Sequence, residues 1–519
     1  MRVIKTLAMT TLLALIMGSS VASASTLPHE SLEQERPTTV PAGLLNKMQI
    51  VAEKANAQDS AGARTALQAV LTDPDFSTLP HTLQKEIMSF AGLTDAMLED
   101  WPAAYDHLMA GGPLSDPGKN GTYYFYLSEA DRQTGHKDQS LAALTTLAQV
   151  SPDFASNLNI GLIMDTSHYA ASLGDNGLQE KQFLEALWAA HYQSPDIYQP
   201  NDYVWFSLFE LEVAAGQDDK ARELMTAFTE PETVIKLRGD NRYARFLKED
   251  SAADAFQVRL DASIAAARDL VKLHPDSVEA VSNLAYRLAA ANHLDEALNL
   301  TDDVLAKVAA APKDKPVYDD QIEKLAWIHM TRSLIMARQN HLDKQLKAQE
   351  SARDIAATSL DHVSQNINLG YTYAADGKPH EALDVIAQVD TGSSSGYGLM
   401  AADEVRACAY QQLGDKAKLS ETLTYMKAHL SDGYNPYRHA LMCSGDVDAL
   451  AESLIARLDD PTTRNETLYR LQTYLPQRRG PLAQKWQQTA TSAAARPDVQ
   501  AAIAKYGKVE AYPVYEALE

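Results

Sequence analysis

The chain has 519 residues, of which 45% are hydrophobic, with 24 glycines and 22 prolines. This composition excludes collagen-like, low-complexity and wholly disordered chains, and it leaves ample apolar material for a large core. Asp and Glu number 69 against 46 Lys and Arg, which gives a formal net charge of -23. Because so acidic a chain is repelled by phosphate backbones and anionic head groups, we do not expect it to bind nucleic acid.

Residues 1–24 have the pattern of a secretory signal peptide. Arg2 and Lys5 precede the apolar run 7–17, and Ala22-Ser23-Ala24 supplies an A-x-A site, so cleavage is predicted after Ala24. The apolar run is too short to predict a membrane span, and no later stretch reaches the necessary length. We therefore expect an exported, soluble protein without an integral membrane part, located most simply in a periplasm.

Beyond the signal peptide, the polar segment 25–43 contains three prolines and predicts a flexible leader. Apolar residues at helical spacing then predict a helix over 44–57 that pairs with a helix over 61–71. Another second helix is predicted to begin at Trp101. Strand-like alternation of apolar and polar residues is almost absent, so the sequence predicts an all-α protein.

A recurring unit consists of an apolar helix, a short turn with Gly or Asn, and a second helix with Ala near its start. The clearest copy spans 366–383, with Leu369, Gly370 and Tyr373 on one face, Gly377 in the turn and Ala382 where two helices approach closely. Two further copies span 283–298 and 205–221. Trp205 in the latter fits a packing position in the core.

At these residues the sequence resembles the tetratricopeptide repeat (TPR) family. Turn markers of this kind follow one another along the chain, mostly 31 to 48 residues apart: Gly135, Gly174, Gly216, Asn292, Asn340, Gly377, Gly414 and Gly445. One wider interval predicts a degenerate repeat near 240–273. The resemblance implies an irregular α-solenoid of stacked helix hairpins whose inner groove binds peptide segments or partner helices.

The expected organisation places TPR-like repeats at 44–233 and 257–480, an irregular segment at 234–256 and a capping segment at 481–519. Pro-Asp pairs, as at Pro275-Asp276, mark places where one helix ends and another begins. Asp276 and Glu279 have the spacing of a capping box. After Gly445, helices are expected at 447–458 and 464–475.

The segment 234–256 is locally basic in an acidic chain, and Arg242 and Tyr243 are its candidate binding residues. Two interpretations remain: a functional loop, or a linker between two halves of the solenoid. In a linker, Arg242 would pair with nearby acids such as Glu249 or Asp250.

Cys408 and Cys443 are the only cysteines. An oxidising compartment allows them to pair. Measured from the turn residues Gly414 and Gly445, however, they are offset by about one helical turn, and this favours two unpaired buried cysteines over a disulfide.

The sequence contains few motifs that would indicate catalysis, metal binding or cofactor binding. The stretch 392–396 matches the G-x-S-x-G pattern but lies in a Ser/Gly-rich connection, without the strand that a nucleophile elbow needs. His439, four residues before Cys443, is a faint metal candidate. No P-loop, Rossmann fingerprint or HExxH motif occurs, so no enzyme activity, metal or cofactor is expected.

The chain has 23 tyrosines but only 10 phenylalanines. Tyr123-Tyr124-Phe125-Tyr126 cannot all face inward on one helix, since consecutive residues point about 100° apart. Tyr124, Tyr126 and Tyr203 are therefore candidate contacts for a peptide or a sugar. The alternative is that they serve repeat packing.

Three functions follow in order of preference. The first is a non-catalytic scaffold or adaptor with an acidic groove, for which a basic protein or peptide partner would fit. The second is a periplasmic protein that binds glycans or cell-wall fragments through Tyr and Trp. The third is an enzyme of polysaccharide metabolism, which would need a carboxylate pair in the groove.

Overall fold

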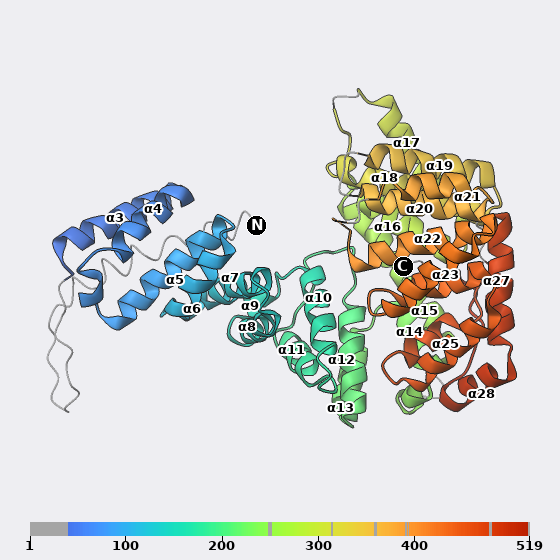
Figure 1. The fold of residues 1–519 in the computed structure, drawn as a ribbon, viewed down its shortest axis with the longest axis horizontal. Helices are drawn as coiled ribbons and strands as arrows, with labels where there is room; N and C mark the ends of the chain where they lie inside the picture. Colours follow the sequence, from blue (N-terminus) through green and yellow to red (C-terminus); the bar gives the residue numbers. More distant parts are fainter. Residues whose placement is uncertain are drawn as a thin grey trace. The chain divides into compact units, whose positions relative to one another are not determined.

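The computed structural model describes residues 40–247, 252–312, 315–357, 361–389, 392, 394–476 and 480–516. The predicted signal peptide, most of the leader, and Glu249 and Asp250 lie outside these residues. The described residues form α-helices joined by short connections, with two isolated β-bridges and no strand (Figure 1). The predicted all-α fold of stacked helix hairpins is confirmed.

The chain divides into two compact units, unit 1 up to Phe228 and unit 2 from Thr229 onward. Unit 1 is a series of antiparallel helix pairs, and its predicted helices at 44–57, at 61–71 and from Trp101 are all present. Its helices are α3 (Ala42–Asn56), α4 (Ser60–Leu71), α5 (His81–Met97), α6 (Trp101–Gly111), α7 (Asn120–Gln133), α8 (Lys137–Val150), α9 (Pro152–Ala155), α10 (Ile160–Ala171), α11 (Leu178–Ala189), α12 (Asp202–Ala214) and α13 (Asp218–Leu224), with short 3-10 helices at Phe76–Thr78, Pro117–Lys119 and Met225–Ala227.

Unit 2 begins with α14 (Pro231–Gly239), the 3-10 helix η4 (Asn241–Phe246) and the long α15 (Ala252–Leu273). In the segment 234–256, expected to be irregular, the described residues 234–247 and 252–256 are thus largely helical. Further pairs and a C-terminal group follow: α16 (Val278–Ala290), α17 (Leu294–Ala310), α18 (Gln321–Arg338), α19 (Leu342–Ala356), α20 (His362–Ala375), α21 (Pro379–Ile386), α22 (Gly396–Leu413), α23 (Lys416–Ala428), α24 (Tyr434–Ser444), α25 (Val447–Asp459), α26 (Arg464–Arg470), α27 (Pro481–Ala494) and α28 (Pro497–Tyr506).

The turn markers that define the repeat all adopt one backbone conformation. All eight predicted positions have positive φ, including Asn292 at 65° and Gly377 at 76°. This left-handed conformation ends a helix and turns the chain, and Gly and Asn adopt it most readily. The eight turns expected from the sequence are therefore observed.

The predicted capping box at Asp276 and Glu279 is wrong. The N-cap of α16 is Ser277, whose hydroxyl accepts a bond from the backbone N–H of Ala280 at 3.1 Å. The carboxylate of Asp320 accepts bonds from the backbone N–H groups of Val278 at 2.6 Å and Glu279 at 3.0 Å. A side chain from the next hairpin therefore supplies the cap, which sequence spacing does not reveal.

Replacing Asp320 by Ala is expected to lower the stability of unit 2 by about 1–2 kcal/mol, because two N–H groups at the start of α16 lose their acceptor. Chemical denaturation measures the loss. Asp319→Ala is the matched control, since the neighbouring Asp319 is exposed and its side chain has no hydrogen bond to any described residue. Equal stability of the two variants would contradict this account of the cap.

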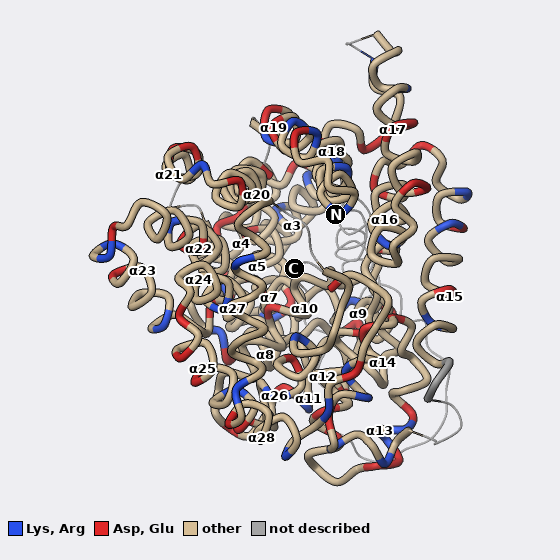
Figure 2. Tube along the Cα trace, turned by 90° about the vertical axis from the view of Figure 1, so that its right-hand side faces the viewer, with Lys and Arg blue, Asp and Glu red and all other residues tan. Residues whose placement is uncertain are grey.

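The C-terminal segment joins the two ends of unit 2. The backbone N–H of Lys508 donates to the carbonyl of Gly239 at 3.0 Å, and that of Tyr515 donates to the carbonyl of Ala290 at 2.9 Å. Helix α26 also packs against α14. In Figure 2, α14, α15 and α16 lie on one side of unit 2, and α22, α24 and α25 lie on the other. The predicted cap thus covers the last repeat and also contacts the first helices of the unit.

Cys408 and Cys443 form a disulfide, with their Cα atoms 5.0 Å apart, so the sequence-based preference for unpaired cysteines is wrong. Cys408 lies on α22 and Cys443 on α24, and these first helices of neighbouring pairs pack against each other. The two helices are not aligned at their turn glycines. The cysteines lie at different distances from their turn glycines, by about one helical turn. Because α22 and α24 are shifted along each other by a similar amount, the two cysteines face each other.

A charge cluster also holds the ends of unit 2 together. Lys236 on α14 pairs with Glu466 on α26 at 3.0 Å, and Arg470 binds the same carboxylate at 2.8 Å. Burial of Glu466 raises its pKa, but the positive charges of Lys236 and Arg470 outweigh burial and hold the pKa at about 2, below its ordinary value of 4.5. Because the folded pKa is depressed, this carboxylate stabilises the fold above about pH 4.5, and the contribution disappears as the pH falls toward 2.

Glu466→Gln is therefore expected to destabilise unit 2 at pH 7 and to have a much smaller effect at pH 3, where the wild-type carboxylate has begun to lose its advantage. Urea denaturation of both proteins at the two pH values measures the difference. Glu421→Gln on the exposed face of α23 is the control and should be neutral at both. A penalty for Glu466→Gln that does not depend on pH would refute the charge-based explanation.

Candidate functional site

Unit 2 contains a cavity of about 690 Å³. Most of its wall comes from the first helices of successive pairs, namely α16, α18, α20, α22 and α24. The remaining wall comes from α19, α26 and α27, and Glu516 of the C-terminal segment completes it. Cavities of roughly 300–1,000 Å³ are typical of sites that bind drug-sized ligands.

The lining residues follow helical periodicity, which explains how the repeats build one surface. On α24 they are Asn435, Pro436, Arg438, His439 and Met442, and all except Pro436 are spaced at i, i+3, i+4 and i+7. Residues with this spacing share one face of a helix. Each first helix thus buries one stripe in its own hairpin and presents another to the cavity.

One side of the wall is aromatic. The rings of Tyr371 and Trp486 meet edge to face with centroids 5.7 Å apart, and the His439 ring lies 6.5 Å from that of Tyr371. Trp327 also lines the cavity, and its indole N–H donates to the carboxylate of Asp361 at 2.9 Å. Tyr371 and Trp486 belong to α20 and α27, so this wall exists because the C-terminal group packs against the repeats.

Polar groups occupy the remaining wall, and most of them are paired. Nδ1 of His439 lies 3.2 Å from the carboxylate of Glu404, and Arg470 binds Glu516 at 3.3 Å. The side-chain oxygen of Gln345 is buried without a hydrogen-bond partner among the described residues. Arg438 is only 8% exposed, and no described residue hydrogen-bonds or ion-pairs with its guanidinium. Buried polar groups normally have partners, so the guanidinium of Arg438 on the cavity wall marks where a ligand would bind.

The tyrosines predicted as contacts in unit 1 lie on different helix pairs. Tyr124 and Tyr126 are half-buried on α7 and pack against the core of unit 1. Burial raises the pKa of Tyr126. Tyr203 on α12 is 43% exposed, and its hydroxyl hydrogen-bonds to Nε2 of His168. Of the three, only Tyr203 is exposed, and a binding role for these residues stays a prediction.

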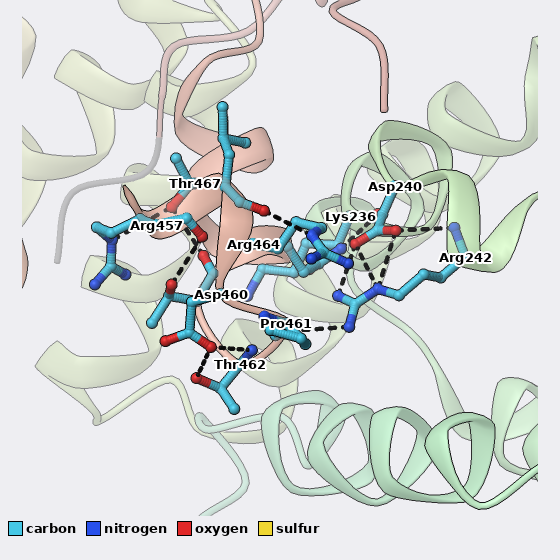
Figure 3. A network of polar contacts seen from close by, with 12 residues as sticks. Lys236, Asp240, Arg242, Arg457, Asp460, Pro461, Thr462, Arg464 and Thr467 are labelled. Carbon is cyan, nitrogen blue, oxygen red and sulfur yellow. Dashed lines mark hydrogen bonds and ion pairs between the residues drawn. The ribbon is translucent and has the colours of Figure 1, made fainter. Parts of the chain in front are cut away.

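Arg242 and Tyr243 have structural contacts in unit 2. The guanidinium of Arg242 binds the carboxylate of Asp240 at 2.7 Å and donates to the carbonyl of Pro461 at 2.9 Å (Figure 3). Tyr243 is fully buried, so its side chain is not available at the surface. These contacts tie η4 to the connection before α26, and the Arg242 partner that we identify is Asp240.

The faint metal candidate His439 interacts with Glu404, and no group of three or more His, Cys, Asp or Glu side chains arranged to hold a metal occurs among the described residues. In the Ser/Gly-rich stretch at 392–396, the hydroxyl of Ser395 caps α22, which begins at Gly396. Ser394 and Ser395 also line the cavity.

None of the helices in the described part of the chain is long and apolar enough to cross a membrane.

Sequence analysis did not identify Arg438, Gln345 or Trp486. Each is an isolated residue in an ordinary helical pattern, and its importance depends on which helices surround it. The stripe Asn435, Arg438, His439 and Met442 was a usable signal, because an Arg among residues at core-facing spacing is unusual.

No family model matches the sequence, and no curated protein matches it. One aligned solved structure is that of a Rap protein complexed with Competence and Sporulation Factor, at 11% identity and a TM-score of 0.32, covering 87% of this chain and 99% of that one. Another is Naa15/Naa10 bound to HypK-THB, at 13% identity and a TM-score of 0.24, covering 89% and 79%. Both TM-scores are below 0.5, so neither likeness carries an argument about function. The fold itself defines the class: an all-α helical-repeat protein.

Proposed function

We propose that this is an exported, non-catalytic helical-repeat protein that binds a segment of a protein or peptide partner in the cavity of unit 2. The observation that carries the proposal is the wall itself, to which successive first helices contribute aromatic, amide and charged side chains around one space. Amide side chains such as Gln345 and Asn368 can bond to a peptide backbone. Trp327 and Trp486 offer large apolar contact areas of the kind that dominate binding energy.

The acidic surface supports a basic partner and a salt-dependent encounter. With a formal net charge of -23, the protein attracts positively charged molecules at long range, and added salt screens this attraction. A sugar ring against Tyr371 and Trp486 is the second candidate occupant, because flat aromatic rings suit both ligands. Binding of a neutral glycan would be nearly indifferent to salt.

The test is site-specific photo-crosslinking in the producing cell. A benzophenone amino acid at Met330 would report from the cavity, and the same group at Ile322 is the control, since Ile322 lies on the same helix and is 75% exposed. We expect one protein to be captured from position 330 and not from 322, and less of it at high salt. Capture of no protein from 330, or equal capture from both positions, would contradict the proposal.

The proposed export is tested separately, by determining the N-terminal residue of the protein in the cell. The N-terminal residue of protein recovered from the periplasmic fraction should be Ser25. Recovery of the chain only in the cytoplasm, with Met1 or Arg2 at its start, would contradict the exported assignment.

A further inference from the structure

One guanidinium in the cavity wall has no hydrogen-bonding or ion-pairing partner among the residues that the structure describes. Arg438 on α24 lines the cavity and is more than nine-tenths buried. Arginine stays protonated throughout the physiological pH range. Burying a charge without a partner is costly, so a buried guanidinium that has no partner among the described residues is suited to receive its counter-charge from a ligand.

The other charged residues of the wall do not supply that counter-charge. The carboxylate of Glu404 interacts with His439 at 3.2 Å. Arg470 lies between two carboxylates, Glu516 at 3.3 Å and Glu466 at 2.8 Å. Both acidic residues of the wall, Glu404 and Glu516, therefore contact other side chains, and neither of them pairs with Arg438.

The surroundings of Arg438 limit the shape of the missing ligand. Tyr371 and Trp486 provide rings 5.7 Å apart on facing elements, a surface for a flat apolar group. The volume of about 690 Å³ is ample for a small molecule or a few residues of an extended segment.

We propose that the cavity binds a ligand in which a carboxylate lies next to a planar apolar group, with the carboxylate on Arg438 and the planar group against Tyr371 and Trp486. The guanidinium presents paired N–H donors that match the two oxygens of a carboxylate. This inference rests on the cavity being a binding site but not on its occupant being a protein. A small organic acid and an acidic partner segment offer the same chemistry, and the experiment separates them.

The experiment titrates the mature protein, residues 25–519, with acids and their uncharged amides. The small-molecule arm pairs phenylacetate with phenylacetamide and indole-3-acetate with indole-3-acetamide. The peptide arm pairs a capped peptide containing Trp-Asp with its Trp-Asn counterpart. Isothermal titration calorimetry measures binding in both arms. We expect the acid to bind at least tenfold more tightly than its amide in one arm, and the arm that responds identifies the source.

Arg438→Gln should remove the preference for the acid over its amide. We expect the affinity for the acid to fall at least tenfold and the affinity for the amide to stay unchanged. Arg406→Gln is the control, because Arg406 on α22 pairs with Asp403 and does not line the cavity. The melting temperature of ligand-free Arg438→Gln should equal or exceed that of the wild type, since the variant loses an unpaired buried charge.

Three outcomes would overturn the inference: no preference for the acid in either arm, an acid preference that survives Arg438→Gln, or a lower melting temperature with equal loss of acid and amide binding. The last would show that Arg438 supports the fold. If position 330 captures no protein but the acid preference is found, the adaptor function fails and this inference stands.

Discussion

Replacing Gly507 by Val is expected to destabilise unit 2 by about 3 kcal/mol, one of the two largest effects that the structure predicts for a single site. A Cβ atom at this position would lie 2.0 Å from the carbonyl oxygen of Gly239 and 2.8 Å from a methyl carbon of Leu468. Its φ of -172° is extended backbone that any residue adopts, so the penalty is purely steric. The clash falls where Lys508 donates to Gly239 and the C-terminal segment meets α14.

Chemical denaturation followed by far-ultraviolet circular dichroism measures this loss. Gly43→Val is the matched control, because a Cβ atom at Gly43 meets nothing within 4 Å. That variant should be within about 0.5 kcal/mol of the wild type, as surface substitutions usually are. A Gly507→Val protein as stable as Gly43→Val would mean that the C-terminal segment does not close unit 2 in this way.

Loss of the disulfide is the second large effect. The double variant Cys408→Ala/Cys443→Ala is expected to lose about 3–4 kcal/mol, because the bond closes a loop of 35 residues whose freedom in the unfolded chain it restricts. The loss should appear in the unfolding of unit 2 and leave that of unit 1 unchanged, since both cysteines belong to unit 2.

Reduction of the wild type provides the internal control. Denaturation in dithiothreitol should bring the wild type to the stability of the double variant, and the reductant should have no further effect on the variant. A wild type that is equally stable with and without the reductant would show that the cross-link does not form or does not stabilise the fold.

The local features of the fold could be predicted from the sequence because they depend on neighbouring residues. Apolar spacing located helices such as α4 and α6, and Gly or Asn marked the turns with positive φ, such as Asn292 and Gly377. A helix and its turn need only contacts a few residues away, so their signals lie within a short window of sequence.

The features that were missed depend on residues far apart in the chain. The disulfide requires the axial displacement of α22 against α24, and the cap of α16 comes from Asp320, more than forty residues away. The cavity requires the C-terminal group to return to α14 and α16, which places Trp486 against Tyr371. Small differences between successive repeats determine how the helices stack over the whole unit, and no single repeat shows these differences.

The central claim is that the cavity of unit 2 is the binding site, and filling it tests that claim most directly. Ala401 on α22 lines the cavity, whereas Leu413 at the end of the same helix is 39% exposed and does not. Ala401→Trp should fold, as judged by its circular dichroism, and should lose both the crosslink from position 330 and the preference for carboxylates. Leu413→Trp should keep both. A folded Ala401→Trp protein that binds as well as the wild type would contradict the account.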